Sequence, residues 1–341
     1  MNTDAVPPRI GIWGTGSYLP SRIRTNEEVA EATGVTPEWI QERTGVRSRH
    51  VAAAEEAASD LAAAAVRSAA HAAGVDPTEI GLLVCATSTP DELGPSTACR
   101  VQGLLKADRA VALDVSAACS GWLFAAKVAH DWLREDPSKG YAAVVGTEAY
   151  SKFLNPTDRG TAVLFADGAA AAILGPVPEP YGFTDFTFGS DGSLADLVLI
   201  PAGGSRRPAD PATLRDRGHT IQMDGRAVSR FIRDVFPRLV HDSLERNGLK
   251  LRDVDRIVTH QPNPVLLRAL AQQIGIRDEQ LVVVGDEVGN IGAASAPYAL
   301  ATAARGSLRP GDTVLVTVFG AGMTWGSALL TWHRPEERPI P

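Results

Sequence analysis

Short runs made mostly of apolar residues recur along the chain and predict strands that are buried inside a protein core. The runs lie at residues 80–87, 110–115, 141–146, 169–174, 254–259, 281–284, 313–319 and 327–332. Segments with a helical spacing of apolar residues separate several of these runs, which is typical of α/β proteins. The pattern therefore predicts an α/β fold with buried strands in both halves of the chain.

The second half of the chain repeats the pattern of the first half. The run 110–115 leads through a turn at Cys119 into an apolar helix, and the run 281–284 leads through a Gly-rich turn into a helix over 293–304. We interpret this repeat as two homologous α/β halves, whereas an unduplicated α/β protein with the usual alternation is the alternative. The expected divisions are an N-terminal half over 1–175, a connecting or substrate-covering segment over 176–220, and a C-terminal half over 221–341.

Composition and charge restrict the classes of function. The chain has 341 residues, of which 44% are apolar, and its net charge of −7 argues against nucleic acid as the main partner. No apolar run approaches the length that spans a membrane, so no membrane partner is expected. Cys85, Cys99 and Cys119 show no close pairing and no metal-ligand spacing, which indicates a reducing compartment and a cytoplasmic location.

Cys119 is the candidate nucleophile of this chain. It lies where a buried strand meets a helix, and unpaired N–H groups at a helix N-terminus favour the thiolate form of a cysteine. The residues around it, 116–118 and 120–121, are small and leave room for a substrate. A small buried core thiol is the alternative interpretation.

His260 and Asn290 are the candidate partners of this thiol. His260 follows the strand at 254–259, and ligands of α/β sheets bind at the carboxyl ends of strands. Asn290 lies in the turn of the second half that matches the Cys119 turn, where its amide would donate to an oxyanion. A hydrogen-bonded structural histidine and an ordinary turn asparagine are the alternatives. The other six histidines are expected on polar helix faces or in loops.

Motifs along nearly the whole chain resemble those of the β-ketoacyl-acyl carrier protein synthase III family, within the thiolase-like condensing-enzyme superfamily. They occur in the family's order at residues 14–20, 39–45, 114–121, 156–160, 167–170, 260–263, 289–290 and 319–322. The resemblance implies an α/β thiolase-like fold, which is a duplicated five-layer α-β-α-β-α arrangement. It also implies that the protein is a homodimer.

The resemblance further implies a two-step reaction. Cys119 would take an acyl group from acyl-coenzyme A (acyl-CoA) as a thioester, with the backbone N–H groups of Cys119 and Ala321 as the oxyanion hole. His260 and Asn290 would hold a malonyl thioester on an acyl carrier protein, which loses carbon dioxide and condenses with the acyl group. The expected role is to prime fatty-acid or polyketide synthesis. The reaction requires no cofactor, and acyl-CoA enters as a substrate.

Other positions match the family's substrate path. Trp39 and Arg159 match the pair that holds the adenine of coenzyme A. The positions that match its phosphate and pantetheine path are Arg43, Gly225 and Asn263. The position before Pro95 commonly carries a bulky residue that closes the acyl pocket across the dimer, and here it is Gly94.

Several positions depart from the family's pattern. Ser229 replaces a pocket phenylalanine, while Phe319 keeps its place in the acyl pocket, so Gly94 and Ser229 predict an acyl donor larger than acetyl. The motif Asn-Thr-Ser is here Asn-Ile-Gly at residues 290–292. Val265 stands where a basic residue commonly contacts the carrier protein, although Arg226, Arg230, Arg233 and Arg268 would supply a basic face.

Other functions stay open at this point. The close alternative is an acyltransferase of the same fold that passes the acyl group to a hydroxyl, an amine or a carrier thiol without condensation. Cys119 argues against a non-catalytic partner subunit that has lost its nucleophile. A cysteine hydrolase is a further alternative, because a cysteine with a histidine serves both chemistries.

Overall fold

Two five-stranded β-sheets lie at the centre of the computed structural model, which describes residues 8–333. The first sheet has the order β1-β7-β6-β4-β5, formed by Arg9–Tyr18, Asp167–Val177, Tyr141–Ala149, Ile80–Ala86 and Val111–Val115. The second sheet has the order β8-β14-β13-β11-β12, formed by Gly182–Ser190, Thr324–Thr331, Thr313–Gly320, Arg256–Thr259 and Leu281–Val282. Each of the eight apolar runs overlaps one of these strands, so the strand predictions are confirmed.

The two sheets share one topology. If β1, β4, β5, β6 and β7 are matched in chain order with β8, β11, β12, β13 and β14, the strand order is the same in both sheets. In the first sheet β4 pairs parallel with β5 and β6, and β7 pairs antiparallel with β6 and β1. The corresponding strands of the second sheet pair in the same directions. This repeated topology supports the interpretation of the sequence as a duplication.

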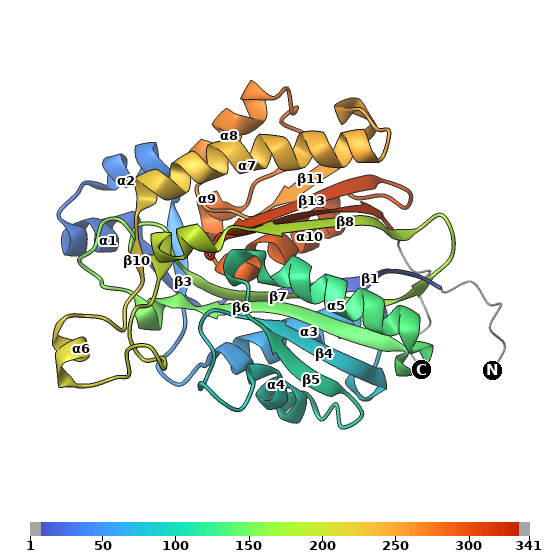
Figure 1. Ribbon diagram of the computed structural model, residues 1–341, viewed down its shortest axis with the longest axis horizontal. Helices are drawn as coiled ribbons and strands as arrows, with labels where there is room; N and C mark the ends of the chain where they lie inside the picture. The colour runs from blue at the N-terminus through green and yellow to red at the C-terminus, as the bar shows by residue number, and fades with distance from the viewer. Residues whose placement is uncertain (1–7, 334–341) are drawn as a thin grey trace.

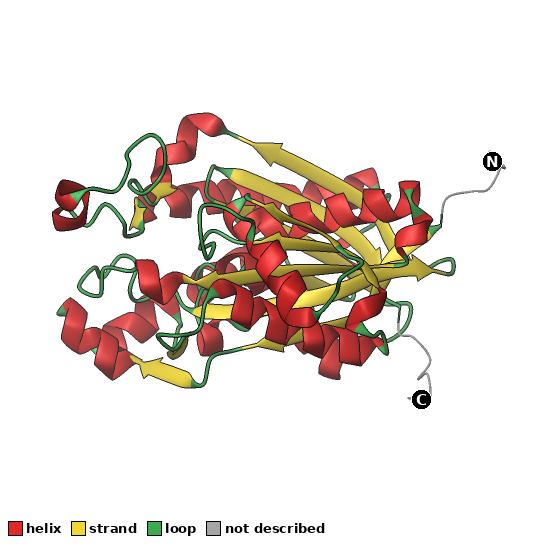
Figure 2. Cartoon of the chain, turned by 90° about the horizontal axis from the view of Figure 1, so that it is seen from below, coloured by secondary structure: helices red, strands yellow, loops and turns green. Residues whose placement is uncertain are grey.

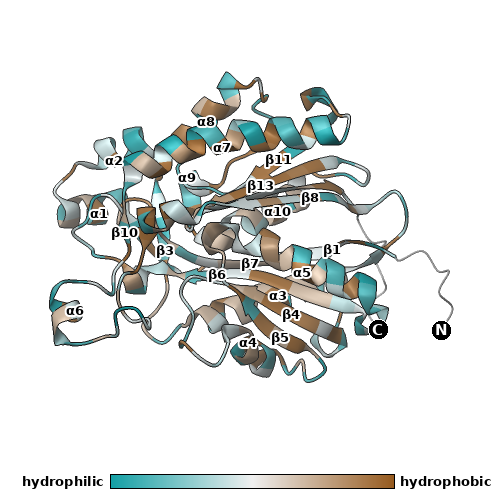
Figure 3. Cartoon of the chain, in the orientation of Figure 1, coloured by the Kyte–Doolittle hydropathy of each residue, from teal (hydrophilic) through white to brown (hydrophobic). Residues whose placement is uncertain are grey.

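Helices form three layers around the two sheets (Figure 1), and Figure 2 looks along this stack from below, with helices in front of the strands. The middle layer holds α5 (Gly121–Glu135) and α10 (Ser295–Gly306), and the outer layers hold α3 (Ala58–Ala73) with α4 (Thr97–Leu105) and α7 (Gly225–Arg246) with α8 (Pro264–Gln273). Helices of the middle layer touch sheets on both sides and bury small alanine side chains, whereas the outer helices turn polar faces to solvent (Figure 3). The expected five-layer α-β-α-β-α fold is therefore confirmed.

Shorter elements gather around one end of the sheets. They are α1 (Asn26–Thr33), α2 (Pro37–Thr44), α6 (Pro211–Arg215), α9 (Gly285–Val288), β2 (Arg22–Thr25), β3 (Ser48–Val51), β9 (Val198–Leu199) and β10 (Gln222–Met223). Among residues 8–333, no helix combines the length and the apolar character needed to cross a membrane.

The structure differs from the sequence predictions in three places. Strands β1 and β8 were not predicted, because Gly and polar residues interrupt their apolar positions. The expected boundary at residue 176 falls inside β7, and β8 makes residues 182–190 part of the second sheet and not of a connecting segment. His130 is buried in α5 against the rings of Phe183 and Phe186, so its expected exposure is wrong.

Candidate active site

Cys119 lies in a short 3₁₀ turn, η2 (Ala118–Ser120), that joins β5 to α5. The preceding Ala118 has a φ of +46°, a conformation that costs free energy for a residue with a Cβ and is common beside active sites. Strand β13 approaches this turn so closely that a Cβ at Gly320 would lie 2.7 Å from the Cys119 nitrogen. The second sheet therefore packs directly against the nucleophile, and Ala321 follows at the same point.

The environment of Cys119 favours the protonated form of its thiol. Burial and the nearby Glu148 carboxylate together raise the pKa of Cys119 to about 12, although a hydrogen bond with the Tyr150 hydroxyl lowers it. Although the residue is partly exposed to the cavity, its sulfur lies deep at the cavity floor, where the thiolate would lose its hydration. Burial therefore opposes the thiolate form that the helix N-terminus favours.

His260 directly follows β11 and is 3% exposed. Its backbone N–H donates to the Thr317 carbonyl at 3.1 Å, and its ring packs edge-on to Phe319 with 5.5 Å between ring centroids. Burial lowers the pKa of His260 to about 3, while a hydrogen bond with the Gly292 backbone raises it. The imidazole is therefore neutral at physiological pH and can donate a hydrogen bond without carrying charge.

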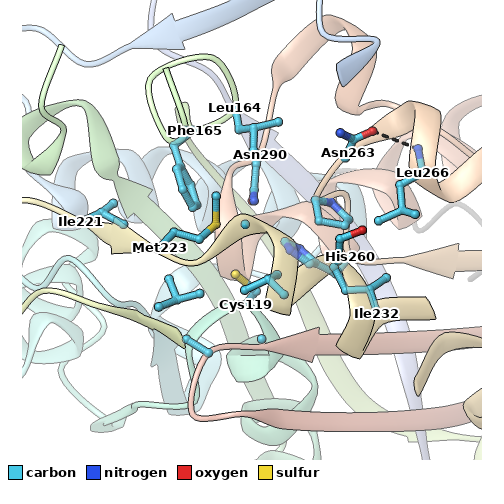
Figure 4. Close-up of a pocket in the computed structure, with 18 of the residues that line it drawn as sticks. Cys119, Leu164, Phe165, Ile221, Met223, Ile232, His260, Asn263, Leu266 and Asn290 are labelled. Carbon is cyan, nitrogen blue, oxygen red and sulfur yellow. Dashed lines mark hydrogen bonds between the residues drawn. The ribbon is translucent and has the colours of Figure 1, made fainter. Parts of the chain in front are cut away.

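Asn290 lies between α9 and the 3₁₀ turn η7 (Gly292–Ala294). Its backbone N–H donates to the Leu164 carbonyl at 2.8 Å, which ties this turn to the first half of the chain. The Asn290 Oδ1 accepts a hydrogen bond from the Gly292 N–H at 2.9 Å. This bond fixes the amide so that its nitrogen points into the cavity (Figure 4).

These three side chains share one cavity of about 770 Å³. Figure 4 shows Cys119, His260 and Asn290 converging on it from three different elements. The walls are apolar and include Leu164, Phe165, Val198, Ile221, Met223, Ile232 and Leu266. An apolar cavity with a few convergent polar groups is the usual form of a small-molecule site.

Most of the other predicted site residues line the same cavity. They are Trp39, Arg43, Arg159, Gly225, Ser229, Asn263, Phe319 and Ala321. The Arg159 guanidinium lies 6.0 Å from the centre of the Trp39 ring. Asn263 caps α8, because its Oδ1 accepts from the Leu266 N–H and its Nδ2 donates to the Arg43 carbonyl. Its amide therefore holds the cavity rim together.

Gly94 does not line this cavity. A Cβ at this position would meet no atom of its own chain within 4 Å. Its loop instead borders a second cavity, formed by residues such as Leu93, Pro95 and Ser96, and the two cavities meet at Ser88 and Ser116. Any effect of Gly94 on the acyl pocket must act across a dimer.

The sequence analysis missed the group of polar residues that surrounds the sulfur. Glu148 lies at the end of β6, while Tyr150 and Ser88 come shortly after β6 and β4, and nothing in their local sequence marks them as functional. The one signal for these residues is that ligands of α/β sheets bind at the carboxyl ends of strands. Strands β4 and β6 are parallel neighbours and end at the same edge of the first sheet.

Comparisons with known proteins agree with this geometry. The family 3-oxoacyl-[acyl-carrier-protein (ACP)] synthase III matches residues 113–192, and its C-terminal family matches residues 244–332. The chain is 40% identical over 326 residues to a β-ketoacyl-[acyl-carrier-protein] synthase III of Desulfitobacterium hafniense, covering 95% of this chain and 98% of the relative. It is 42% identical over 328 residues to the acetoacetyl CoA synthase NphT7 of a Streptomyces species, covering 95% and 99%.

A solved structure shows the same similarity in three dimensions. The crystal structure of a 3-oxoacyl-(acyl carrier protein) synthase III from Pseudomonas aeruginosa superposes with a TM-score of 0.87 at 36% sequence identity. The superposition covers 97% of this chain and 100% of that chain. The similarity therefore extends through both five-stranded sheets.

Proposed function

Because this chain belongs to the β-ketoacyl-[acyl-carrier-protein] synthase III family, we propose that its cavity primes fatty-acid or polyketide synthesis in two steps. Acyl-CoA first acylates Cys119, and a malonyl group on a carrier protein then condenses with the acyl group as it loses carbon dioxide. The observation that carries this proposal is the convergence of Cys119, His260 and Asn290 on one cavity.

In the loading step the Cys119 sulfur attacks the acyl carbonyl of the donor. The tetrahedral oxyanion needs preorganised donors, and the backbone N–H groups of Cys119 and Ala321 supply them. The close approach of Gly320 to the Cys119 turn supports this pairing, because it brings β13 beside the nucleophile. The coenzyme A thiolate is the leaving group.

In the condensation step His260 and Asn290 hold the carbonyl oxygen of the malonyl thioester. Decarboxylation leaves an enolate, whose negative charge develops on that oxygen. The low pKa of His260 keeps the imidazole neutral, and the Gly292 N–H keeps the Asn290 amide nitrogen pointing inward. The enolate carbon then attacks the acyl-Cys119 carbonyl, and the Cys119 thiolate leaves.

The cavity mouth suits coenzyme A. Trp39 offers a flat ring for the adenine with Arg159 beside it, and Arg43, Arg226 and Arg233 are exposed cations for the phosphates. Among residues 8–333, none of these four arginines has a carboxylate within 4 Å, so their charge is available to an anionic ligand. The same basic face supports docking of an acidic carrier protein.

A homodimer is part of this proposal. Strand β5 is an edge of the first sheet, and the apolar side chains of Val111, Leu104 and Leu93 near it are exposed. An exposed edge strand with apolar neighbours is a ready pairing surface for a second copy. We place the reaction in the cytoplasm, because the catalytic thiol must stay reduced. The two steps use no metal or redox cofactor.

The test mixes an acyl-CoA with a malonyl-carrier protein and follows carbon dioxide and the β-ketoacyl product. Both are expected in proportion to the acyl-CoA consumed. Acyl-Cys119 without either product would favour the acyltransferase alternative, in which the acyl group passes to a hydroxyl, an amine or a carrier thiol. Free acid released from acyl-Cys119 by water would favour the hydrolase.

A further inference from the structure

The hydroxyl of Tyr150 lies beside the nucleophile. Tyr150 begins the turn η4 (Tyr150–Phe153), directly after β6, and is 4% exposed with its ring edge against Phe165. Tyr150 lines the same cavity as Cys119 and Ser88, and the Tyr150 Oη and the Glu148 Cγ lie 2.4 Å and 2.8 Å from the point that a Cβ at Gly292 would occupy. A phenol between a thiol and a carboxylate is therefore built into the cavity floor.

Glu148 is a fully buried carboxylate at the end of β6. Its oxygens accept hydrogen bonds from the Ser88 N–H at 3.1 Å, the Thr89 hydroxyl at 3.1 Å and the Ala293 N–H at 3.3 Å. Within the described part of the chain, no Lys or Arg lies within 4 Å of it. Because hydrogen bonds hold it and no cation fixes its charge, this carboxylate can change its protonation state during a reaction.

We propose that Tyr150 is a catalytic residue of the loading step and that its hydroxyl relays the thiol proton of Cys119 to the Glu148 carboxylate. The proposal rests on the proposed function, since it concerns the same nucleophile. In this relay Glu148 accepts the proton from Tyr150 and does not itself touch the substrate.

The proton transfers balance over one turnover. In loading, the Cys119 S–H bond breaks, its proton binds the Tyr150 oxygen, and the phenol proton moves to Glu148. The sulfur electron pair forms the new S–C bond, and coenzyme A leaves as a thiolate that takes a proton from solvent. In condensation the Cys119 thiolate leaves, takes a proton from Tyr150, and Glu148 returns its proton to Tyr150.

The pKa values decide between the two available bases. Burial raises the pKa of Glu148 to about 8, whereas burial lowers the pKa of His260 to about 3. The carboxylate therefore binds the thiol proton far more tightly than the imidazole does. The titratable groups around Glu148 are Cys119, Tyr150 and the buried Cys85 of β4, and the His260 imidazole interacts with the Gly292 backbone. None of these groups brings a cation at neutral pH.

The first experiment compares Tyr150→Phe with Tyr141→Phe. Tyr141 stands at the opposite end of the same strand, so its variant is a matched control for the loss of one phenol. Rapid-quench intact-mass measurement with hexanoyl-CoA and acetyl-CoA should show loading slowed by about 10²-fold in Tyr150→Phe and unchanged in Tyr141→Phe. Equal loading rates in Tyr150→Phe and the wild-type protein would overturn the relay.

The second experiment measures the pH dependence of Cys119 alkylation by iodoacetamide, mapped by peptide mass because Cys99 is exposed. In the wild-type protein the rate should rise with pH and level off near pH 8, where Glu148 is ionised. In Glu148→Gln and Tyr150→Phe the rate should be lower and should keep rising to pH 9.5. If the alkylation rate still levels off near pH 8 in both variants, a group other than Glu148 controls it and the relay is contradicted.

Two controls keep the outcomes separate. Glu148→Asp retains a carboxylate and should keep the plateau, which covers the case that Glu148→Gln fails to fold. Alkylation needs no acyl donor, so it tests the relay even if the wild-type protein loads no acyl group. Failure of loading in the wild-type protein would instead contradict the proposed function.

Discussion

Gly292 and Tyr150 fit against each other in the cavity floor. A Cβ at position 292 would lie 2.4 Å from the Tyr150 hydroxyl oxygen and 2.7 Å from the Tyr150 ring, and Gly292 has a φ of +52°. The family motif Asn-Thr-Ser carries a serine at this position, which would collide with Tyr150 as it lies here. The glycine and the tyrosine are therefore coupled, and the departure from the motif makes room for the phenol.

Substitution of Gly292 should consequently be destabilising in a way that depends on Tyr150. Gly292→Ala should lower the free energy of unfolding by about 1–3 kcal/mol through overpacking, and by about 1–2 kcal/mol more through its left-handed backbone. The double variant Gly292→Ala/Tyr150→Leu should recover the free energy of unfolding that Gly292→Ala loses through overpacking, and urea unfolding measures this recovery. Strictly additive effects of the two substitutions would show that the residues are not coupled.

Cys119→Ala should abolish acyl loading and leave the fold intact. The substitution removes only a sulfur atom from a turn of small residues, so we expect the free energy of unfolding to change by about 1 kcal/mol. Intact mass after incubation with acyl-CoA, together with a thermal unfolding curve, checks both statements. An acyl adduct that persists in this variant would place the nucleophile elsewhere.

His260→Ala and Asn290→Asp should separate the two steps. Both variants should retain substantial Cys119 acylation, because loading uses backbone donors, and both should decarboxylate malonyl thioester about 10²–10³-fold more slowly. Asn290→Asp keeps the Oδ1 that accepts from Gly292 but replaces the donating nitrogen with an oxygen. Release of carbon dioxide from malonyl-carrier protein is the measurement, and a variant that decarboxylates normally but fails to load would reverse the assigned roles.

The raised pKa of Glu148 predicts a pH-dependent stability. The carboxyl titrates near 4.5 in the unfolded chain and at about 8 in the folded protein, so between these values the folded state binds more protons than the unfolded state. Its contribution to stability is present below pH 4.5 and is lost as the pH rises towards 8. Urea unfolding at pH 5, 6.5 and 8 should show this loss in the wild-type protein and a smaller loss in Glu148→Gln. A constant difference between the two proteins across these pH values would contradict the assignment.

The acyl pocket should prefer a donor larger than acetyl. Gly94 and Ser229 leave space where the family commonly has bulky residues, and each additional buried methylene contributes up to about 0.8 kcal/mol, or roughly fourfold in binding. Gly94→Phe should shift the preference towards acetyl, and it should do so only in a dimer, since Gly94 has open space in its own chain. Loading rates with acetyl-CoA and hexanoyl-CoA are the comparison, and a clear acetyl preference in the wild-type protein would contradict the enlarged pocket.

The sequence by itself determined the buried strands and the strand-to-helix position of Cys119. Eight mostly apolar runs mark the strands, most of which are buried, and this pattern is local. It missed β1 and β8, because glycine and polar residues interrupt their apolar positions. The resemblance added the family, and with it the residues that line the cavity.

Only the tertiary structure decided the state of the reacting groups. Burial among residues from both halves of the chain raises the pKa of Cys119, and this effect opposes the helix N-terminus that the sequence shows. The close fit of Tyr150 against Gly292, in the cavity that Cys119 also lines, joins three segments that are far apart in the chain. Burial and long-range contact arise from packing of the whole chain, so no local pattern could predict them.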